Sequence, residues 1–307
     1  MSGILLGVVP VFALIAIGYC LKISGFLPLE RWAPIEKLSI SVLYPGFLIP
    51  AIWGADLTGH AATAASAAAV GAVAIVGALA LLLRPLMRIP GPSFTSVFQG
   101  LTRWNSFVFL PVIRQTFGQH GLALAAVMLA VLIPVVNIVC VWVMVRWGEG
   151  QAGTSPKAVA KAMFQNPILL ACLAGLALNF AHIPTIPGAW ELLKLLGDAA
   201  LPLGLLIAGA GLHFREAVSR PWIMGLTTAV KVLVMPFLMW GLAVLFGADR
   251  TTQGVVMLCG AAPGAAASYV LSRQMGGDSP LMAGIIALTV VVSAVTIPVL
   301  LALFHFG

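Results

Sequence analysis

A proline and two glycines interrupt an apolar run near the C-terminus, in the sequence Cys259-Gly260-Ala261-Ala262-Pro263-Gly264-Ala265-Ala266-Ala267-Ser268. Pro263 has no N–H to donate and disfavours helical dihedrals at Ala262, while glycine lowers the cost of leaving the helix. Unwound backbone is tolerated at membrane depth only where protein or a water-filled cavity satisfies its polar groups. The stretch therefore predicts a broken membrane helix, and such breaks are typical of binding sites in transporters.

The composition is that of a polytopic membrane protein. Of the 307 residues, 61% are hydrophobic and 8% are charged, whereas a soluble domain carries about 25% charged residues. The first apolar run, residues 3–21, has no charged region before it and no small-residue cleavage site after it, so we expect a retained helix. The four cysteines lie inside apolar runs without metal-site or disulfide spacing. We expect no metal, no cofactor and no nucleic acid partner.

We predict an all-α fold of ten transmembrane helices in a 5+5 inverted repeat. The approximate ranges are 3–22, 36–54, 61–83, 93–116, 121–146, 164–181, 190–212, 222–246, 252–274 and 279–305. The fourth and ninth segments are interrupted, so helices four and nine are expected to be broken and to cross. Residues 1–147 form the first repeat, 148–163 a hydrophilic cytoplasmic linker, and 164–307 the second repeat.

The repeat rests on a common offset between the halves. A shift of 157 to 159 residues aligns Lys37 with Lys194, Pro45 with Pro202, Trp104-Asn105 with Pro263-Gly264, Arg114-Gln115 with Arg273-Gln274, and Gly118 with Gly277. Because five segments per half is an odd number, the two halves must run through the membrane in opposite directions, which is a widespread transporter architecture.

Basic residues orient the chain. If the N-terminus is outside, the odd-numbered loops are cytoplasmic, and they hold Lys22, Arg31, Lys37, Arg84, Arg88, Arg146, Lys157, Lys161, Arg215, Arg220 and Arg273. The even-numbered loops hold only Arg114, Lys194 and Arg250. This asymmetry predicts that both termini face the periplasm or exterior of an inner (plasma) membrane. The net charge of +7 is therefore read as an orientation signal.

These features resemble a bacterial member of the auxin efflux carrier family, related to plant PIN exporters and distantly to bile acid:sodium symporters. The resemblance covers the whole chain and is carried by Val9-Pro10-Val11-Phe12-Ala13-Leu14-Ile15-Ala16-Ile17-Gly18-Tyr19, Leu43-Tyr44-Pro45-Gly46-Phe47-Leu48 and the two interrupted segments. It implies ten helices in a 5+5 inverted repeat, with broken helices four and nine crossing near the midplane. It also implies transport of organic anions, such as auxin in plants and malate or malonate in bacteria.

The chain departs from the plant pattern at two places. The Asn-Pro-Asn type of sequence at the first crossover is here Trp104-Asn105-Ser106, with no proline beside the asparagine. A short linker after Trp147 stands where plant exporters have a long cytoplasmic loop. The resemblance therefore does not carry auxin itself over as the substrate.

Three polar residues at the first interruption are candidates for substrate binding. Arg103 lies about ten residues into the fourth segment, where a charge costs at least ~2.5 kcal/mol on insertion scales and usually has a function. It is expected to bind a substrate carboxylate, although an arginine that snorkels or caps carbonyls would look the same. Asn105 and Ser106 could bind substrate beside freed backbone N–H groups, or could satisfy the unwound backbone.

Pro263, Gly264 and Ser268 are the candidates at the second interruption, where small residues would expose backbone groups to a cavity. The alternative is a proline kink with close helix packing. Tyr44, beside Pro45 in the second segment, is a further candidate for substrate binding.

Three residues are candidates for coupling transport to an ion. Lys231 lies deep in the eighth segment and could exchange a proton, or could pair with Asp198, the one acidic residue far from a segment end. Asp198 could itself carry a proton or ligate Na⁺, or serve a structural pair. Asn137 is a weaker candidate, because a lone membrane asparagine more often bonds between helices.

The sequence therefore predicts a secondary active transporter of small organic carboxylates that works by alternating access. Segments four and nine, with segments three, five, eight and ten, would move against a scaffold. The chain is not expected to be an enzyme, and H⁺ or Na⁺ is the coupling ion to be tested. An intramembrane enzyme and an uncoupled channel or sensor on the same fold remain alternatives. The expected partners are a small anion, the lipid bilayer and a second copy of the chain.

Overall fold

The computed structural model describes residues 2–55, 60–149, 167–213 and 220–305, and every regular element within these ranges is helical. The helices are α1 (Ser2–Ile23), α2 (Leu29–Leu38), α3 (Tyr44–Trp53), α4 (Ala61–Met87), α5 (Gly91–Thr102), α6 (Ser106–Trp147), α8 (Pro167–Phe180), α9 (Ala189–Ala210), α10 (Pro221–Ala229), α11 (Met235–Leu245), α12 (Arg250–Ala261), α13 (Ala266–Met275) and α14 (Ser279–Leu303). Two π-helical turns, η1 (Ser39–Leu43) and η3 (Val230–Val234), join α2 to α3 and α10 to α11. The all-helical prediction is confirmed for these residues, whereas most of the predicted linker lies outside them.

Six helical stretches are long and apolar enough to cross a membrane. They are Glu30–Trp53, Ala61–Met87, Gly91–Trp147, Ala189–Ala210, Pro221–Leu245 and Ser279–Leu303. A seventh candidate is the pair α12 and α13, which are bent by 44° at their break. Since a single crossing needs about 20 residues, the 57 residues of Gly91–Trp147 are far too many for one span. The helices are those of a multi-pass membrane protein.

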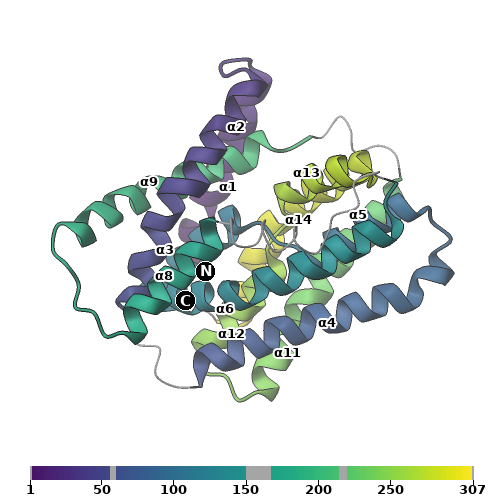
Figure 1. Ribbon diagram of the computed structural model, residues 1–307. Coiled ribbons are helices and arrows are strands. Elements are labelled where there is room, and N and C mark those ends of the chain that lie inside the picture. Colours follow the sequence, from purple (N-terminus) through teal and green to yellow (C-terminus); the bar gives the residue numbers. More distant parts are fainter. Residues whose placement is uncertain (1, 56–59, 150–166, 214–219, 306–307) are drawn as a thin grey trace.

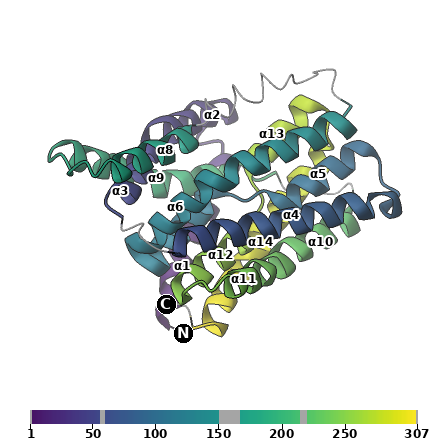
Figure 2. The same ribbon diagram turned by 60° about the horizontal axis from the view of Figure 1, so that its bottom comes forward.

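The helices form two groups, seen side by side in Figures 1 and 2. The first group consists of α1, α2, α3, α8 and α9, and the second of α4, α5, α6 and α10 to α14. The most extensive packing within the first group is between α1 and α9 and between α3 and α8, and in the second between α11 and α12. The two groups meet where α6 packs against α1, α3, α8 and α9.

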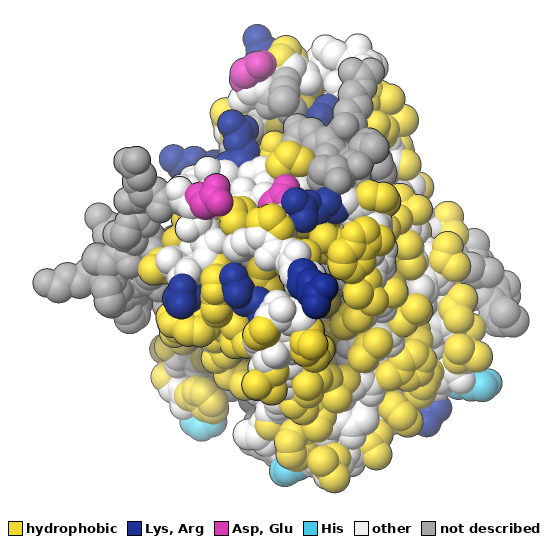
Figure 3. Space-filling view, turned by 90° about the vertical axis from the view of Figure 1, so that its right-hand side faces the viewer, with side chains coloured by type: hydrophobic (Ala, Val, Ile, Leu, Met, Phe, Trp, Pro, Cys, Tyr) yellow, Lys and Arg dark blue, Asp and Glu magenta, His cyan; other side chains and the backbone are white. Residues whose placement is uncertain are grey.

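Lys and Arg side chains gather on one end of the second group. Figure 3 shows them in the middle of the face to which the C-terminal end of α4 and the N-terminal end of α5 point, with hydrophobic side chains around and below them. The clustering matches the basic loops of the sequence, and the surrounding apolar surface suits contact with lipid.

Two of the helices widen immediately before a proline. The π-helical turn η1 ends at Leu43, before Tyr44-Pro45, and η3 ends at Val234, before Met235-Pro236. Because proline cannot donate the backbone bond that closes a normal helical turn, the preceding turn opens while the helix continues.

The second membrane segment begins earlier than predicted. Its helix starts at Leu29, not near residue 36, so Glu36 lies two turns inside it. The polar residues of this first part hid the helix from a search based on apolar runs. Glu30, Arg31 and Lys37 are exposed there, while Glu36 is half-buried.

Glycines allow α1 and α9 to approach each other closely. A β-carbon on Gly209 would overlap the carbonyl oxygen of Ile15, and one on Gly18 would overlap that of Leu206. Small residues at such contacts are typical of packed membrane helices. This contact holds the first group together.

We predict that Gly209→Ala lowers the stability of the protein, because its methyl group forces α1 and α9 apart. Overpacking of this kind costs about 1–3 kcal/mol. Thermal unfolding of the purified protein in detergent should show a clear drop in melting temperature. Gly241→Ala on α11 is the matched control, since no atom lies within 4 Å of its β-carbon position. Equal melting temperatures for the two variants would contradict the prediction.

Candidate functional site

Two helix breaks touch each other in the middle of the second group. The first break, residues 103–105, separates α5 from α6, and the second, residues 262–265, separates α12 from α13. The N–H of Asn105 donates to the carbonyl of Pro263 at 2.8 Å. Each break therefore satisfies a backbone group of the other.

Helix α14 supplies the remaining partners of the second break. The N–H of Gly264 donates to Oγ1 of Thr289 at 3.0 Å, and Oγ of Ser293 donates to the carbonyl of Ala261 at 2.9 Å. Both hydroxyl residues are fully buried. The expectation that freed amides at the break are available to substrate is therefore wrong for Gly264, whose N–H already has a partner in the protein.

The two helices that restart after the breaks differ at their first turns. Asn105 caps α6, because its Oδ1 accepts from the N–H of Phe107 at 3.0 Å. Helix α13 begins after Ala265 without a side-chain cap, and no acceptor within the described residues bonds the N–H groups of Ala266 and Ala267. Uncapped N–H groups and the positive end of the helix dipole favour an anion at this position.

A cavity of ≈ 270 Å³ lies against both breaks. It is bounded by the second group at the breaks and on α6, and by the first group on α2, η1 and α8. Its lining residues are Glu36, Ile40, Arg103, Trp104, Asn105, Ser106, Phe107, Ile133, Val136, Asn137, Pro167, Ile168, Ala265, Ala266 and Ala267. We call it the break cavity. It therefore lies between the two groups of helices.

Four of the residues predicted from the sequence line the break cavity, namely Arg103, Asn105, Ser106 and Asn137. The Asn105 side chain is only 4% exposed, and because its Oδ1 caps α6, its Nδ2 is left for the cavity. The guanidinium of Arg103 also neighbours the thiol of Cys140 on α6. The first break therefore carries the polar wall of the cavity.

The other predicted binding residues lie outside the cavity lining. Pro263 and Gly264 bond to Asn105 and Thr289 behind it, and the second break presents Ala265, Ala266 and Ala267 instead. Ser268 is fully buried in the first turn of α13. Tyr44 is fully buried as well, with its ring in edge contact with Phe107 at 4.9 Å between centroids.

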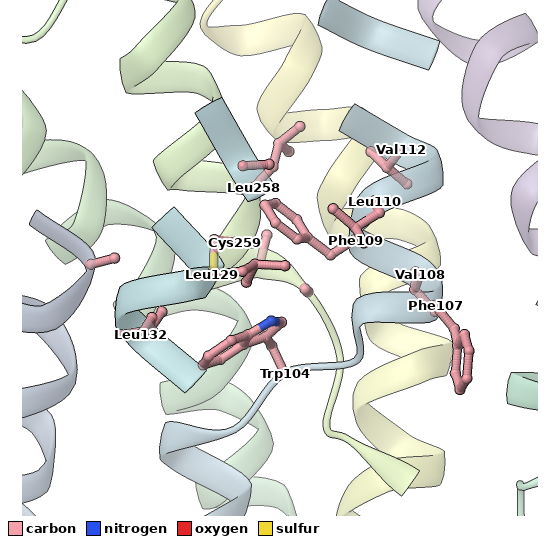
Figure 4. Packing of buried hydrophobic residues seen from close by; sticks show 14 of the residues in the cluster. Trp104, Phe107, Val108, Phe109, Leu110, Val112, Leu129, Leu132, Leu258 and Cys259 are labelled. Carbon is pink, nitrogen blue, oxygen red and sulfur yellow. The ribbon is translucent and has the colours of Figure 1, made fainter. Parts of the chain in front are cut away.

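Among the lining residues that sequence reasoning missed, two have polar side-chain groups, Trp104 and Glu36. Trp104 is 7% exposed and lies beside Leu129 and Leu132 of α6, as Figure 4 shows, and its Nε1 is buried without a partner among the described residues. Glu36 was taken for a residue at the edge of a segment. The scarcity of acidic residues in the chain is the signal that could have drawn attention to it.

A second cavity, of ≈ 340 Å³, lies between the same two groups. It is lined by Gly46, Phe47, Pro50, Ala51, Gly54, Ala55, Arg114, Gln119, His120, Ala123, Trp190, Lys194, Gly197 and Asp198. Arg114 on α6 forms an ion pair with Asp198 on α9 at 3.1 Å. Asp198 therefore pairs with Arg114, and the suggested pair with Lys231 is wrong. The pair joins the two groups at a partly exposed position.

A chain of aromatic contacts connects the linings of the two cavities. Phe107 lines the break cavity, Phe47 lines the second cavity, and Tyr44 contacts both rings, with centroid distances of 4.9 Å and 6.3 Å. In Figure 4 the ring of Phe107 points away from the core residues of its own group.

Lys231 is buried away from both cavities. It lies in η3, is 1% exposed, and has no hydrogen bond or ion pair with the described residues. Its ionisable neighbour is Cys259, on the helix that leads into the second break. No group of three His, Cys, Asp or Glu residues that could hold a metal occurs in the described part of the chain.

Comparison with known proteins points to transporters. The sequence profile of the sodium bile acid symporter family matches residues 203–306, which contain the second break. The chain is 24% identical over 295 residues to an uncharacterized transporter of Methanothermobacter thermautotrophicus, covering 95% of each chain. It is 28% identical over 107 residues to the uncharacterized sodium-dependent transporter YocS of Bacillus subtilis, covering 33% of each chain. Together with the long apolar helices, these matches show a multi-pass membrane protein similar to transporters.

We predict that Thr289→Val destabilises the protein. Valine has the shape of threonine but cannot accept the N–H of Gly264, and an unsatisfied buried amide costs about 1–3 kcal/mol. Thermal unfolding in detergent measures the effect. Thr296→Val is the control on the same helix, because the Thr296 hydroxyl has no partner within the described residues. Identical melting temperatures for the two variants would show that the bond to Gly264 does not hold the break.

Proposed function

We propose that the protein is a secondary transporter of small organic carboxylates that works by alternating access. One observation carries the proposal: two helix breaks bond to each other at the wall of a cavity between two groups of helices. That cavity contains Arg103, the amide of Asn105 and the uncapped first turn of α13. A guanidinium and helix N-termini at one wall are suited to a carboxylate.

The two cavities support alternating access. Both lie at the boundary between the groups, and the contacting rings of Phe107, Tyr44 and Phe47 connect the lining of one to the lining of the other. A rocking movement of the second group against the first would separate these rings and close one cavity as the other opens. The ion pair of Arg114 with Asp198 would form on one side of this cycle and break on the other.

The proposal includes ten spans in a 5+5 inverted repeat, with residues 1–147 and 164–307 as its halves. It is supported by positive φ angles at Gly118 (φ 62), inside α6, and at Gly276 (φ 72), between α13 and α14. These turns divide the chain soon after each break, at an offset close to that of the breaks themselves. Counted this way, Gly91–Trp147 supplies two spans, and α1 and α8 supply one each.

The family relationship and substrate size are parts of the same proposal. The sequence resembles auxin efflux carriers and, more distantly, bile acid:sodium symporters. The profile match supports the relationship to the symporters, and the relationship to auxin efflux carriers is part of the proposal. Pockets for drug-sized ligands have volumes of about 300–1,000 Å³. The break cavity, at ≈ 270 Å³, suits a smaller acid than a steroid. We also propose that the protein is inserted in the plasma membrane with both termini outside. Two copies of the chain would form a dimer.

Two coupling ions are compatible with the proposal. The printed name of the Bacillus subtilis relative indicates sodium dependence for that protein. Lys231 offers a proton site instead, because its amine is buried without a counter-ion among the described residues. Asp198, bound to Arg114, would take part through the ion pair, and Asn137 through the cavity wall.

We predict that Arg103→Ala weakens carboxylate transport, since it removes the charged donor of the cavity. The apparent affinity should fall about 10- to 100-fold, the cost of losing hydrogen bonds to a charged group. Uptake of labelled malate, malonate, propionate, indole acetate, alanine and β-alanine into proteoliposomes measures the loss. Arg273→Ala, an exposed arginine that lines neither cavity, should leave uptake unchanged. Absence of saturable uptake of every acid, with identical behaviour of the two variants, would overturn the carrier proposal.

We predict that Lys231→Met raises the melting temperature and abolishes stimulation of uptake by a proton gradient. Methionine fills similar space without a charge, and burying an unpaired charge is costly. Uptake under imposed H⁺ or Na⁺ gradients is compared with that of Lys37→Met, an exposed lysine. Stimulation by Na⁺ alone, retained in Lys231→Met, would assign coupling to Na⁺ and remove Lys231 from it.

A further inference from the structure

The break cavity carries opposite charges on opposite walls. Arg103 comes from the break between α5 and α6, in the second group, and Glu36 comes from α2, in the first group. Both line the cavity, and both are partly buried. Binding a simple carboxylate requires the positive charge of Arg103 but not the negative charge of Glu36.

Neither charge has an ion-pair partner within the described part of the chain. The described residues contain one ion pair, between Arg114 and Asp198, and no hydrogen bond to the Glu36 side chain. Lys37, the next residue, is exposed, and the Lys22 amine donates to the carbonyl of Leu212. Arg103 contacts the thiol of Cys140 but has no carboxylate partner among the described residues, and Glu36 has no basic partner there. Both can therefore bind a charged group in the cavity.

The polar groups of the two walls differ in kind. The wall formed by the second group offers donors, namely the Arg103 guanidinium, the Asn105 amide and the N–H groups of Ala266 and Ala267. Asn105 is 4% exposed, so its unpartnered Nδ2 is a buried donor at the cavity. The wall formed by the first group offers Glu36, which accepts. The cavity is built for a ligand with an acceptor at one end and a donor at the other.

Charge counting separates the candidate acids. Arg103 and two helix N-termini bring about +1 and +0.5 each, and Glu36 brings about −1. The carboxylate of a plain monocarboxylic acid satisfies the donor wall. Its apolar tail then faces Glu36, so the Glu36 carboxylate loses contact with water and gains no partner. A dicarboxylate places its second negative charge against Glu36. An acid with a protonated amine satisfies both walls.

We propose that the transported acid is a small amino acid, whose ammonium group binds Glu36 while its carboxylate binds Arg103 and the break. The inference rests on the proposed function and specifies its substrate class. Because the cavity measures ≈ 270 Å³, a ligand of a few carbon atoms fits it better than one of drug size. Glu36 then determines specificity, and Arg103 binds the group that all candidate acids share.

Four three-carbon acids test the inference, because they share one carboxylate and differ in the presence, position or charge of a second polar group: alanine, β-alanine, propionate and malonate. For each acid, the unlabelled form competes with the labelled form for uptake into proteoliposomes containing the full chain, and the competition gives the apparent affinity. For the wild type we expect alanine or β-alanine to bind at least about 10-fold more tightly than propionate, the scale of one hydrogen-bonded charge. Malonate should bind most weakly.

Glu36→Gln should abolish this preference. The affinity for the amino acids should fall about 10-fold, the affinity for propionate should stay within about 2-fold, and malonate should bind more tightly, because the charge opposing it is gone. Glu36→Asp, which keeps the charge, should keep the order of the four acids. Glu30→Gln, on the same helix and exposed, is the matched control and should behave as the wild type.

Each outcome decides the matter. Uptake of propionate or malonate with no preference for an amine, or an unchanged order of acids in Glu36→Gln, overturns this inference and leaves the carrier proposal standing. Absence of saturable uptake of all four acids by the wild type overturns both. Melting temperatures and gel-filtration profiles of the variants are compared first, and if Glu36→Gln does not fold, the order of acids in Glu36→Asp and the wild type is decisive.

Discussion

The architecture of the second group depends on one constraint: backbone N–H and C=O groups released by a broken helix must find partners where no water is available. Here two breaks satisfy each other through the bond from Asn105 to Pro263. Two hydroxyl residues of α14 satisfy two more backbone groups at the second break. Either break alone would leave buried backbone groups without partners. The contact between the breaks therefore fixes the positions of α5, α6, α12, α13 and α14.

The same constraint explains why the hydrogen-bond donors of the break cavity lie on one wall. Breaking a helix creates a new N-terminus, whose first N–H groups have no partner within the helix. At α6 the Asn105 side chain caps one of these groups, while at α13 alanines leave them open. The donors needed for an anion are therefore a consequence of the breaks, and Arg103 adds a full charge to them.

Local chemistry could be predicted from the sequence, and tertiary pairing could not. Pro263 with Gly264, and Arg103 with Asn105 at a matching offset, indicated both breaks because proline, glycine and buried charge have local costs. The partner of Asp198 is Arg114, 84 positions away, and no local pattern records that. Tyr44 was a candidate for substrate binding, but packing against Phe107 buries it. Glu36 was missed because its helix begins in a polar stretch.

The division of charges between the two groups bears on how binding and movement are linked. Arg103 moves with the breaks, and Glu36 moves with α2, so a ligand held by both resists separation of the groups at the break cavity. A ligand held only by Arg103 would leave that separation unopposed. Since a ligand shifts a conformational equilibrium only by its difference in affinity for the two states, a molecule bridging both walls favours the state in which they are close. Specificity and alternating access would then depend on the same pair of residues.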